Sequence, residues 1–388
     1  MKLHKIIIIL ALSVFFGNAK AQQLSDSAQI SLLTCEPGTE LYSTFGHSAI
    51  RVCDTQNGID IVFNYGTFDF STKNFYVKFS RGTLLYMLSV ENFDNFLRSY
   101  SFNNRSVFEQ KLNITHAEKE RLFYLLIENY KPENRSYRYD FFKDNCATRI
   151  RDIFQKALGD KLMFSSKNTD GNKTFRQLIY PYLKNMAWSK FGIDVLLGMP
   201  TDAKATNADY MFLPDELFLN VDTATINGIK LSMPSETLYQ SHPNSESNLP
   251  SPNLVFSIFM ILIISLSCLE FYRHKKFSIK IFDRVFFLSL ALFSLLILCM
   301  WIFSLHYPVR NNLNILWLNP LYFYVFVKLE KTNIYVLAIC IICNLIVLCG
   351  QSFLPQQFNT AFFAIIIVSI LRLLMLIFKK SHQKNILK

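Results

Sequence analysis

The chain has 388 residues, of which 51% are hydrophobic and 18% charged, and its formal net charge is +11. This length is enough for two domains of ordinary size. The excess of Lys and Arg lies largely between apolar segments, with neither zinc-finger spacing nor a basic helix interleaved with aromatic residues. The composition therefore argues against nucleic acid as a partner.

The N-terminus has the pattern of a secretory signal peptide over residues 1–21. Two lysines precede an apolar core over residues 6–16, and the Ala-Lys-Ala at residues 19–21 provides a cleavage site. The apolar run is short for a membrane span, and an uncleaved anchor is the alternative interpretation. Under either interpretation, residues 22–240 form a domain outside the cytoplasm.

The exported domain is predicted to start with a β-hairpin. Residues 46–53 alternate small or apolar with polar side chains and contain His47. A turn signal that ends in Asn-Gly separates them from a second strand-like run over residues 59–65. A turn at this Asn-Gly places Asn64 on the same face as His47, whereas a register slip of one residue would place Tyr65 there.

Two helices are expected further along the exported domain. The first covers residues 115–130 and opens with a capping box. The second begins at Cys146, with Asp144 and Asn145 as capping residues and Gly159 as the C-terminal stop. Free N–H groups at a helix N-terminus lower the pKa of a thiol and can form an oxyanion hole, so Cys146 is a candidate nucleophile. His47, which opens a strand, is the candidate base.

The cysteines divide by region. Cys35, Cys53 and Cys146 lie in the exported part, and the other five lie in apolar runs, where cysteine behaves as a small hydrophobic residue. An odd number of cysteines in an oxidising compartment leaves at least one thiol unpaired. A disulfide between Cys35 and Cys53 would leave Cys146 free.

The second half of the chain is predicted to be a membrane domain. A linker rich in Ser, Pro and Asn over residues 241–252 leads to an all-helical region over residues 253–380, and residues 381–388 form a tail. Five apolar segments are predicted as spans, the third and fourth of them near the minimum length; they cover residues 253–272, 285–305, 313–327, 334–350 and 360–378.

The distribution of charge predicts the orientation of these segments. With the first domain outside, the loops at 273–284 and 328–333 and the tail from 379 face the cytoplasm and carry five, two and four Lys or Arg residues. The opposite loops carry only Arg310. This asymmetry follows the positive-inside rule and agrees with the signal peptide.

Two further stretches bear on the membrane. Four asparagines at 311, 312, 314 and 319 fall toward the outer end of the third segment, where they favour protein contacts or a path for a lipid headgroup. The aromatic-rich residues 210–213 are either an interfacial loop or part of the core.

Several motifs resemble a family of exported Bacteroidetes-type membrane proteins, the lipoprotein N-acyltransferases. They are Phe45–Val52, Asn64–Phe70, Lys78–Gly82, Tyr139–Arg149, Trp188–Gly198, Met211–Pro214 and Leu316–Leu321. The resemblance covers most of the chain. It implies an α+β fold, a circularly permuted papain-like (NlpC/P60-type) exported domain, followed by an all-α membrane domain of about five transmembrane helices.

The resemblance also implies roles for individual residues. Cys146 matches the nucleophile and His47 the base of the family. In papain-like sites a third polar residue on the strand after the histidine orients the imidazole. Asn64 is the candidate for this role, and Asp69 is the second choice because a carboxylate orients imidazole well.

The implied activity is N-acylation of lipoproteins at the bacterial inner membrane, with the site facing the periplasm. The acyl donor would be a phospholipid and the acceptor the α-amine of a diacylated lipoprotein, with no metal or soluble cofactor. A cell-wall peptidase needs at most one membrane anchor. Five predicted spans therefore favour a lipid substrate. The alternatives are a membrane-anchored NlpC/P60-like peptidase or amidase, a phospholipase, and a non-enzymatic scaffold in which Cys146 is core packing.

Overall fold

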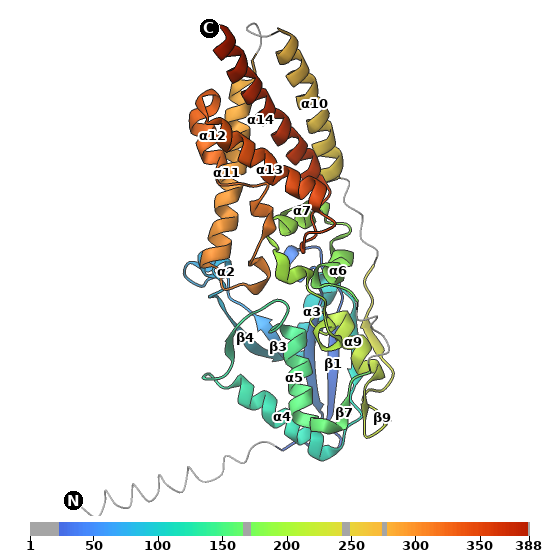
Figure 1. Cartoon of the computed structure of the whole chain (residues 1–388). Coiled ribbons are helices and arrows are strands. Elements are labelled where there is room, and N and C mark those ends of the chain that lie inside the picture. The colour runs from blue at the N-terminus through green and yellow to red at the C-terminus, as the bar shows by residue number, and fades with distance from the viewer. Residues whose placement is uncertain (1–22, 166–171, 243–248, 274–277, 387–388) are drawn as a thin grey trace, which may run out of the picture.

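The computed structural model describes residues 23–165, 172–242, 249–273 and 278–386. The predicted signal peptide, the middle of the predicted linker and the last two residues of the predicted tail lie outside the described residues. Figure 1 shows a mixed α/β part at one end of the molecule and a bundle of long helices at the other.

The exported part is built on a seven-stranded sheet in which hydrogen-bonded neighbours run antiparallel. In spatial order its strands are β10 (Glu236–Tyr239), β5 (Val107–Lys111), β1 (Gln29–Cys35), β2 (His47–Asp54), β3 (Ile59–Thr67), β4 (Leu85–Asn92) and β6 (Ser136–Arg138). A small three-stranded sheet contains β7 (Leu162–Met163), β8 (Thr225–Ile226) and β9 (Ile229–Lys230).

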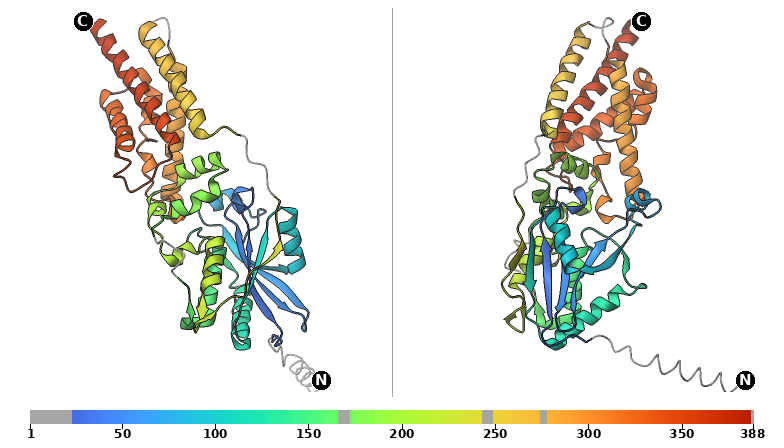
Figure 2. Two further views of the ribbon diagram at one scale, coloured as in Figure 1. Left: turned by 90° about the vertical axis from the view of Figure 1, so that its right-hand side faces the viewer. Right: turned by 180° about the vertical axis from the view of Figure 1, so that it is seen from behind.

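Helices cover both faces of the large sheet (Figure 2). Helices α4 (His116–Tyr130) and α5 (Cys146–Leu158) pack on one face around a core that includes Ile50 and Phe63. Helix α3 (Phe93–Phe102) packs on the other face, against Ala49 and its neighbours. Because successive strand residues point to opposite faces, β2 and β3 each contribute to both cores.

The predicted hairpin is present, but its turn is longer than expected. Asp54, not Gln56, pairs with Ile59, so residues 55–58 form the turn. The register therefore differs from the predicted one by an even number of residues, which leaves every side chain on the predicted face.

The disulfide considered between Cys35 and Cys53 is not formed. Cys35 pairs across the β1–β2 ladder with His47, whereas Cys53 pairs with Gln29 at the opposite end of the same ladder. The two cysteines are therefore separated by the length of the strands, and both thiols are free.

The exported part also contains short helices. They are η1 (Leu41–Ser43), α2 (Phe75–Ser80), η2 (Gly159–Lys161), α6 (Phe175–Ile179), η3 (Tyr180–Leu183), α7 (Ala187–Leu196), η4 (Met199–Asp202), α8 (Asn207–Tyr210) and α9 (Pro214–Thr223). Residues 210–213 were expected to form either an interfacial loop or part of the core. They are buried in the exported part and therefore belong to its core.

The junction between the two parts is tightly packed and polar. The Arg176 guanidinium, which is fully buried, binds Asp194 and Asp202 at 2.8 Å each. The other Asp194 oxygen accepts a hydrogen bond from Asn359 of the membrane part. At Gly198 an added Cβ would lie 2.0 Å from the Arg310 carbonyl oxygen, so only glycine permits this approach of the two backbones.

Among the described residues, three helices are long and apolar enough to cross a membrane, namely α10 (Pro252–Arg273), α11 (Lys280–Phe303) and the first part of α14 (Ala361–Ile386). Helix α13 (Ile334–Gly350) is apolar but shorter. The predicted number of five helical spans is therefore not confirmed.

The third predicted segment forms no continuous helix. It consists of a 3₁₀ turn, η7 (Leu313–Ile315), irregular residues and the short helix α12 (Tyr322–Lys328). Asn312 and Asn314 at its start donate hydrogen bonds to backbone carbonyls of residues 194–196 in the exported part. Glu330 beyond its end forms an ion pair with Lys280 at the other end of α11. The segment thus runs along α11, and much of its irregular backbone is covered by protein.

A charged cluster is buried in the membrane part. Arg372 of α14 makes two hydrogen bonds to Asp283 of α11, at 2.6 and 2.8 Å, and contacts Glu270 of α10. Arg372 and Asp283 have no exposed surface. The cluster links three helices, and charges at this depth are stable only because they are paired.

Candidate active site

The N-terminus of α5 is fixed by side-chain capping. Asn145 accepts a hydrogen bond from the Thr148 N–H, and the Thr148 hydroxyl accepts one from the Asn145 N–H. The Asn145 amide also donates to the carbonyls of Phe141 and Phe212, so the cap is anchored to two other segments. Caps of this kind contribute about 1 kcal/mol, and here they hold Cys146 in one place.

Cys146 is the first residue of α5 and is almost completely buried. Burial raises the pKa of the Cys146 thiol above its ordinary value of 9.0. Hydrogen bonds from the backbone N–H groups of Ser48, Ala147 and Cys146 itself act in the opposite direction, as does the nearby Arg105, but burial outweighs them. The expectation that the helix N-terminus leaves a low pKa at this thiol is therefore wrong, because desolvation is the larger effect.

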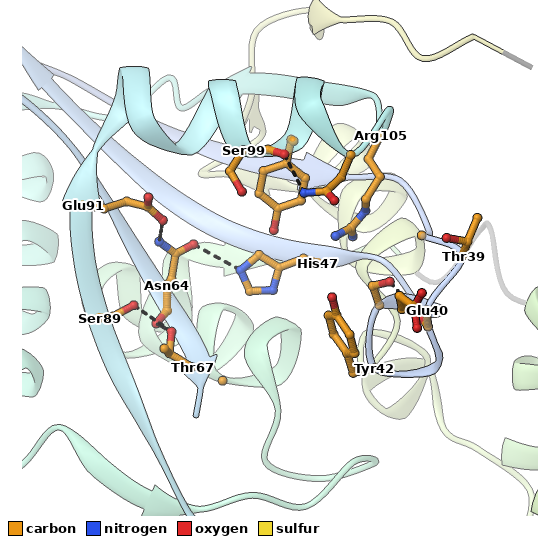
Figure 3. Close-up of a pocket in the computed structure, with 15 residues that line it drawn as sticks. Thr39, Glu40, Tyr42, His47, Asn64, Thr67, Ser89, Glu91, Ser99 and Arg105 are labelled. Carbon is orange, nitrogen blue, oxygen red and sulfur yellow. Dashed lines mark hydrogen bonds between the residues drawn. The ribbon is translucent and has the colours of Figure 1, made fainter. Parts of the chain in front are cut away.

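His47, Asn64 and Glu91 form a chain of hydrogen bonds (Figure 3). The Asn64 amide nitrogen lies 3.0 Å from a Glu91 carboxylate oxygen, to which it must donate. The Asn64 carbonyl oxygen therefore faces His47 Nε2, at 3.2 Å, as an acceptor. The network assigns the proton to Nε2 and leaves Nδ1 of the neutral imidazole as the proton acceptor.

The imidazole is held in its neutral form. Burial lowers the pKa of His47 to about 4, although the hydrogen bond to Asn64 acts to raise it. The positive charge of Arg105 lowers this pKa further. At neutral pH the imidazole can therefore accept a proton.

The thiol and the imidazole lie at the same end of β2. Ser48, whose N–H points to the Cys146 sulfur, directly follows His47 in the strand. Within the described part of the chain no hydrogen bond joins the thiol to the ring directly. Catalytic hydrogen bonds are often long without substrate, so this geometry is compatible with proton transfer once a substrate is bound.

His47 lines a pocket of about 360 Å³ at this end of the sheet (Figure 3). Its lining is mostly polar and consists of Gly38, Thr39, Glu40, Tyr42, Ser43, His47, Asn64, Gly66, Thr67, Ser89, Glu91, Ser99, Tyr100, Asn103 and Arg105. Cys146 lies behind Gly66, where an added Cβ would be 3.7 Å from the Cys146 Cβ. Gly66 has a φ of +89°, a conformation that favours glycine, and the missing side chain leaves space between the pocket and Cys146.

The family model for the Lnb N-terminal periplasmic domain matches residues 16–179, and that for the Lnb transmembrane domain matches residues 244–384. The chain belongs to the Lnb family. This is the family of Bacteroidetes-type lipoprotein N-acyltransferases that the sequence motifs resemble, and the resemblance is thereby confirmed. No curated protein and no solved structure matches the chain significantly, so the papain-like permutation stays a prediction.

Family membership supports a membrane protein with a periplasmic domain and a role in lipoprotein processing.

In this Lnb chain the pocket lies at the end of the sheet nearest the membrane part. Residues 44 and 45, just before β2, contact Met186 and Tyr182 beside α7, and α7 packs on α10 and α11.

Three of the sequence-predicted residues lie away from the pocket of this Lnb protein. Tyr65 points to the opposite face of the sheet, where its hydroxyl accepts a hydrogen bond from Asn129. Asp69 lies in the exposed loop after β3 and accepts hydrogen bonds from Ser71. Asp144 forms an ion pair with Arg149. Asn145, by contrast, supports the site as the cap of α5.

Sequence reasoning missed Glu91 and Arg105. Glu91 reaches Asn64 from the neighbouring strand β4, and Arg105 lies in the pocket lining after α3. The Arg105 Nε donates to the Glu36 carbonyl oxygen, but its buried Nη2 has no partner among the described residues. No local motif marks either residue, because both come to the site through strand pairing. The described residues contain no group of His, Cys, Asp and Glu side chains that could hold a metal ion.

Proposed function

We propose that this Lnb protein is a lipoprotein N-acyltransferase that carries a fatty acyl chain on Cys146 as a thioester. The observation that supports it most is the hydrogen bond between His47 and Asn64 at the membrane-facing end of the sheet, beside a thiol on a capped helix. A thiol nucleophile needs a base near it. If the acyl donor is a phospholipid, the thiol must lie near the outer surface of the bilayer.

In the first step the Cys146 sulfur attacks the carbonyl carbon of a phospholipid acyl ester. Nδ1 of His47 takes the thiol proton as the S–C bond forms, and N–H groups at the start of α5 stabilise the developing oxyanion. The ester C–O bond then breaks, and the imidazolium returns the proton to the leaving alcohol oxygen. The products are a lysophospholipid and an acyl thioester on Cys146.

In the second step the α-amine of a diacylglyceryl-cysteine attacks the thioester carbonyl. Nδ1 of His47 accepts a proton from the amine as the N–C bond forms. The C–S bond breaks, the Cys146 thiolate takes the proton back from the imidazolium, and an amide is released. Atoms and charges balance without a metal or a soluble cofactor.

The raised pKa of the thiol means that this sequence of events starts from a protonated thiol. Because burial keeps Cys146 protonated, the thiol ionises only when a substrate ester is in place and His47 removes its proton. A permanently ionised thiolate is not required, since the base and the nucleophile act together.

The test is mass spectrometry of lipoprotein N-terminal peptides from cells that carry Cys146→Ala or Cys146→Ser as the sole copy. The expected result is loss of the N-linked acyl chain. Cys53→Ala, at the far end of β2, is the matched control and should leave N-acylation intact. N-acylation that persists in Cys146→Ala would contradict the proposal.

Two purified-protein measurements separate the alternatives. Release of free fatty acid instead of N-acylated lipopeptide would identify a phospholipase, whose thioester is discharged by water. Cleavage of cell-wall peptides by the same thiol would identify a peptidase. Neither product is expected at a rate that matches lipopeptide acylation.

A further inference from the structure

An aromatic segment that joins β3 to the start of β4 exposes several large apolar side chains to solvent. We call residues Phe68–Leu85 the aromatic lip; it includes α2. Five of its large apolar side chains are about half or more exposed: Phe70 at 62%, Tyr76 at 77%, Val77 at 59%, Phe79 at 48% and Leu85 at 54%. Clustered exposure of this kind marks a surface that binds protein or membrane.

The aromatic lip is attached to the outer end of a membrane-spanning helix. The Leu305 N–H donates to the Arg81 carbonyl oxygen at 2.9 Å. His306 Nε2 lies 2.7 Å from the Phe79 carbonyl oxygen. Both residues directly follow α11, and Figure 1 shows α2 beside the end of that helix. Phe303 and Leu305 are also exposed, so one apolar surface continues from α11 onto the lip.

The charges of the aromatic lip suit a phospholipid surface. Lys73, Lys78 and Arg81 accompany the aromatic side chains, and Asp69 is the one acidic residue of the segment. Aromatic residues with flanking Lys and Arg are typical of the membrane–water interface, where the rings sit at headgroup level and the cations meet phosphate.

A row of aromatic rings connects the lip to the thiol. Phe68 lies 5.9 Å from Phe75 and 5.3 Å from Tyr86, between ring centroids. Tyr86 stacks on Tyr139 at 4.3 Å. Tyr139 and Cys146 both lie beside Gly66, each within 4 Å of a Cβ placed there. A row of ring contacts therefore leads from the lip to the immediate surroundings of the nucleophile.

We propose that the aromatic lip inserts into the outer leaflet of the bilayer and that the row of rings behind it guides an acyl chain to Cys146. Insertion depends only on the exposed apolar surface and its attachment to α11. The guiding role rests on the proposed acyl transfer. An acyl chain is the ligand that fits, because the row consists of aromatic rings, whereas the pocket that includes Gly66 is lined mostly by polar residues.

Insertion can be measured without any activity. Tyr76→Trp places a fluorophore on the lip, and Tyr124→Trp places one on α4, where Tyr124 is 58% exposed. Both variants are reconstituted in vesicles that contain brominated phosphatidylcholine, and the wild-type protein gives the signal of the native tryptophans. The added fluorescence at residue 76 should be quenched, and that at residue 124 should not. Equal quenching of the two would overturn insertion.

The guiding role is tested with two donors. Phe68→Ser interrupts the row, and Tyr124→Ser is the control. With long-chain phospholipid in vesicles, Phe68→Ser should lower kcat/KM about tenfold or more, as expected when an acyl chain loses its positioning contacts. With a short-chain phospholipid in detergent the loss should be less than about threefold, because few methylenes reach the row.

Equal losses with both donors would overturn the guiding role. That outcome is distinct from failure of the proposed function, which would appear as N-acylation by Cys146→Ala. Circular dichroism and thermal unfolding of Phe68→Ser show whether the variant folds. If it does not, Tyr86→Ser, which interrupts the row at the next ring, replaces it with the same two expected outcomes.

Discussion

The resting state of the thiol can be tested by its rate of alkylation as a function of pH. With a pKa above 9.0 for Cys146, fewer than about one in a hundred of these thiols is ionised at pH 7. Because His47 has a pKa of about 4, it carries no positive charge at this pH that could stabilise a thiolate. Only the thiolate reacts, so the rate should rise about tenfold per pH unit, or about 100-fold between pH 6 and pH 8.

The assay is alkylation by iodoacetamide in vesicles, with the peptide that contains Cys146 quantified by mass spectrometry at each pH. Resolving this peptide separates Cys146 from the other seven cysteines of the chain. His47→Gln should leave the slope unchanged, because no ion pair is lost. A rate that varies less than about threefold between pH 6 and pH 8 would refute the reasoning, since it would show a preformed thiolate–imidazolium pair.

Substitutions at three further places, with their controls, test other parts of the structure. Asn64→Ala removes the acceptor that orients the imidazole and should lower kcat of acyl transfer about 10- to 100-fold, whereas Asp69→Ala should change it little. Gly66→Ala, at a φ of +89°, should cost about 1–3 kcal/mol in the free energy of unfolding and abolish thioester formation, measured by intact-protein mass spectrometry. Asp283→Leu should destabilise the protein by about 3–5 kcal/mol by leaving Arg372 buried without its main partner, and Asp283→Leu/Arg372→Met should recover part of this loss in thermal unfolding.

The local features of the site were predictable from the sequence. A capping residue before a helical pattern places Cys146 at a helix N-terminus, and the alternation of a strand places Asn64 on the face of His47. The second prediction survived an incorrect turn, because a register error of an even number of residues preserves the face. Whether these residues are catalytic stays a prediction.

The remaining features depend on contacts between distant segments. Glu91 and Arg105 reach the pocket through strand order, which no local pattern encodes. The pKa of Cys146 was predicted in the wrong direction because the helix terminus is visible in the sequence and the degree of burial is not. The third apolar segment has the composition of a membrane span but does not form a continuous helix. Asn312 and Asn314 at its start donate instead to backbone carbonyls of the exported part.

The close approach at Gly198 has a consequence for exchanging parts between family members. The carbonyls of residues 194–197 are satisfied by Asn312, Asn314 and Gln356, all of which come from the membrane part. A chimera joined within the linker at residues 241–252 would cut the chain once yet take the two sides of each of these contacts from different parents. Recombination should therefore succeed only when the segment from α7 to η4 is inherited together with the spans, as a single unit of exchange.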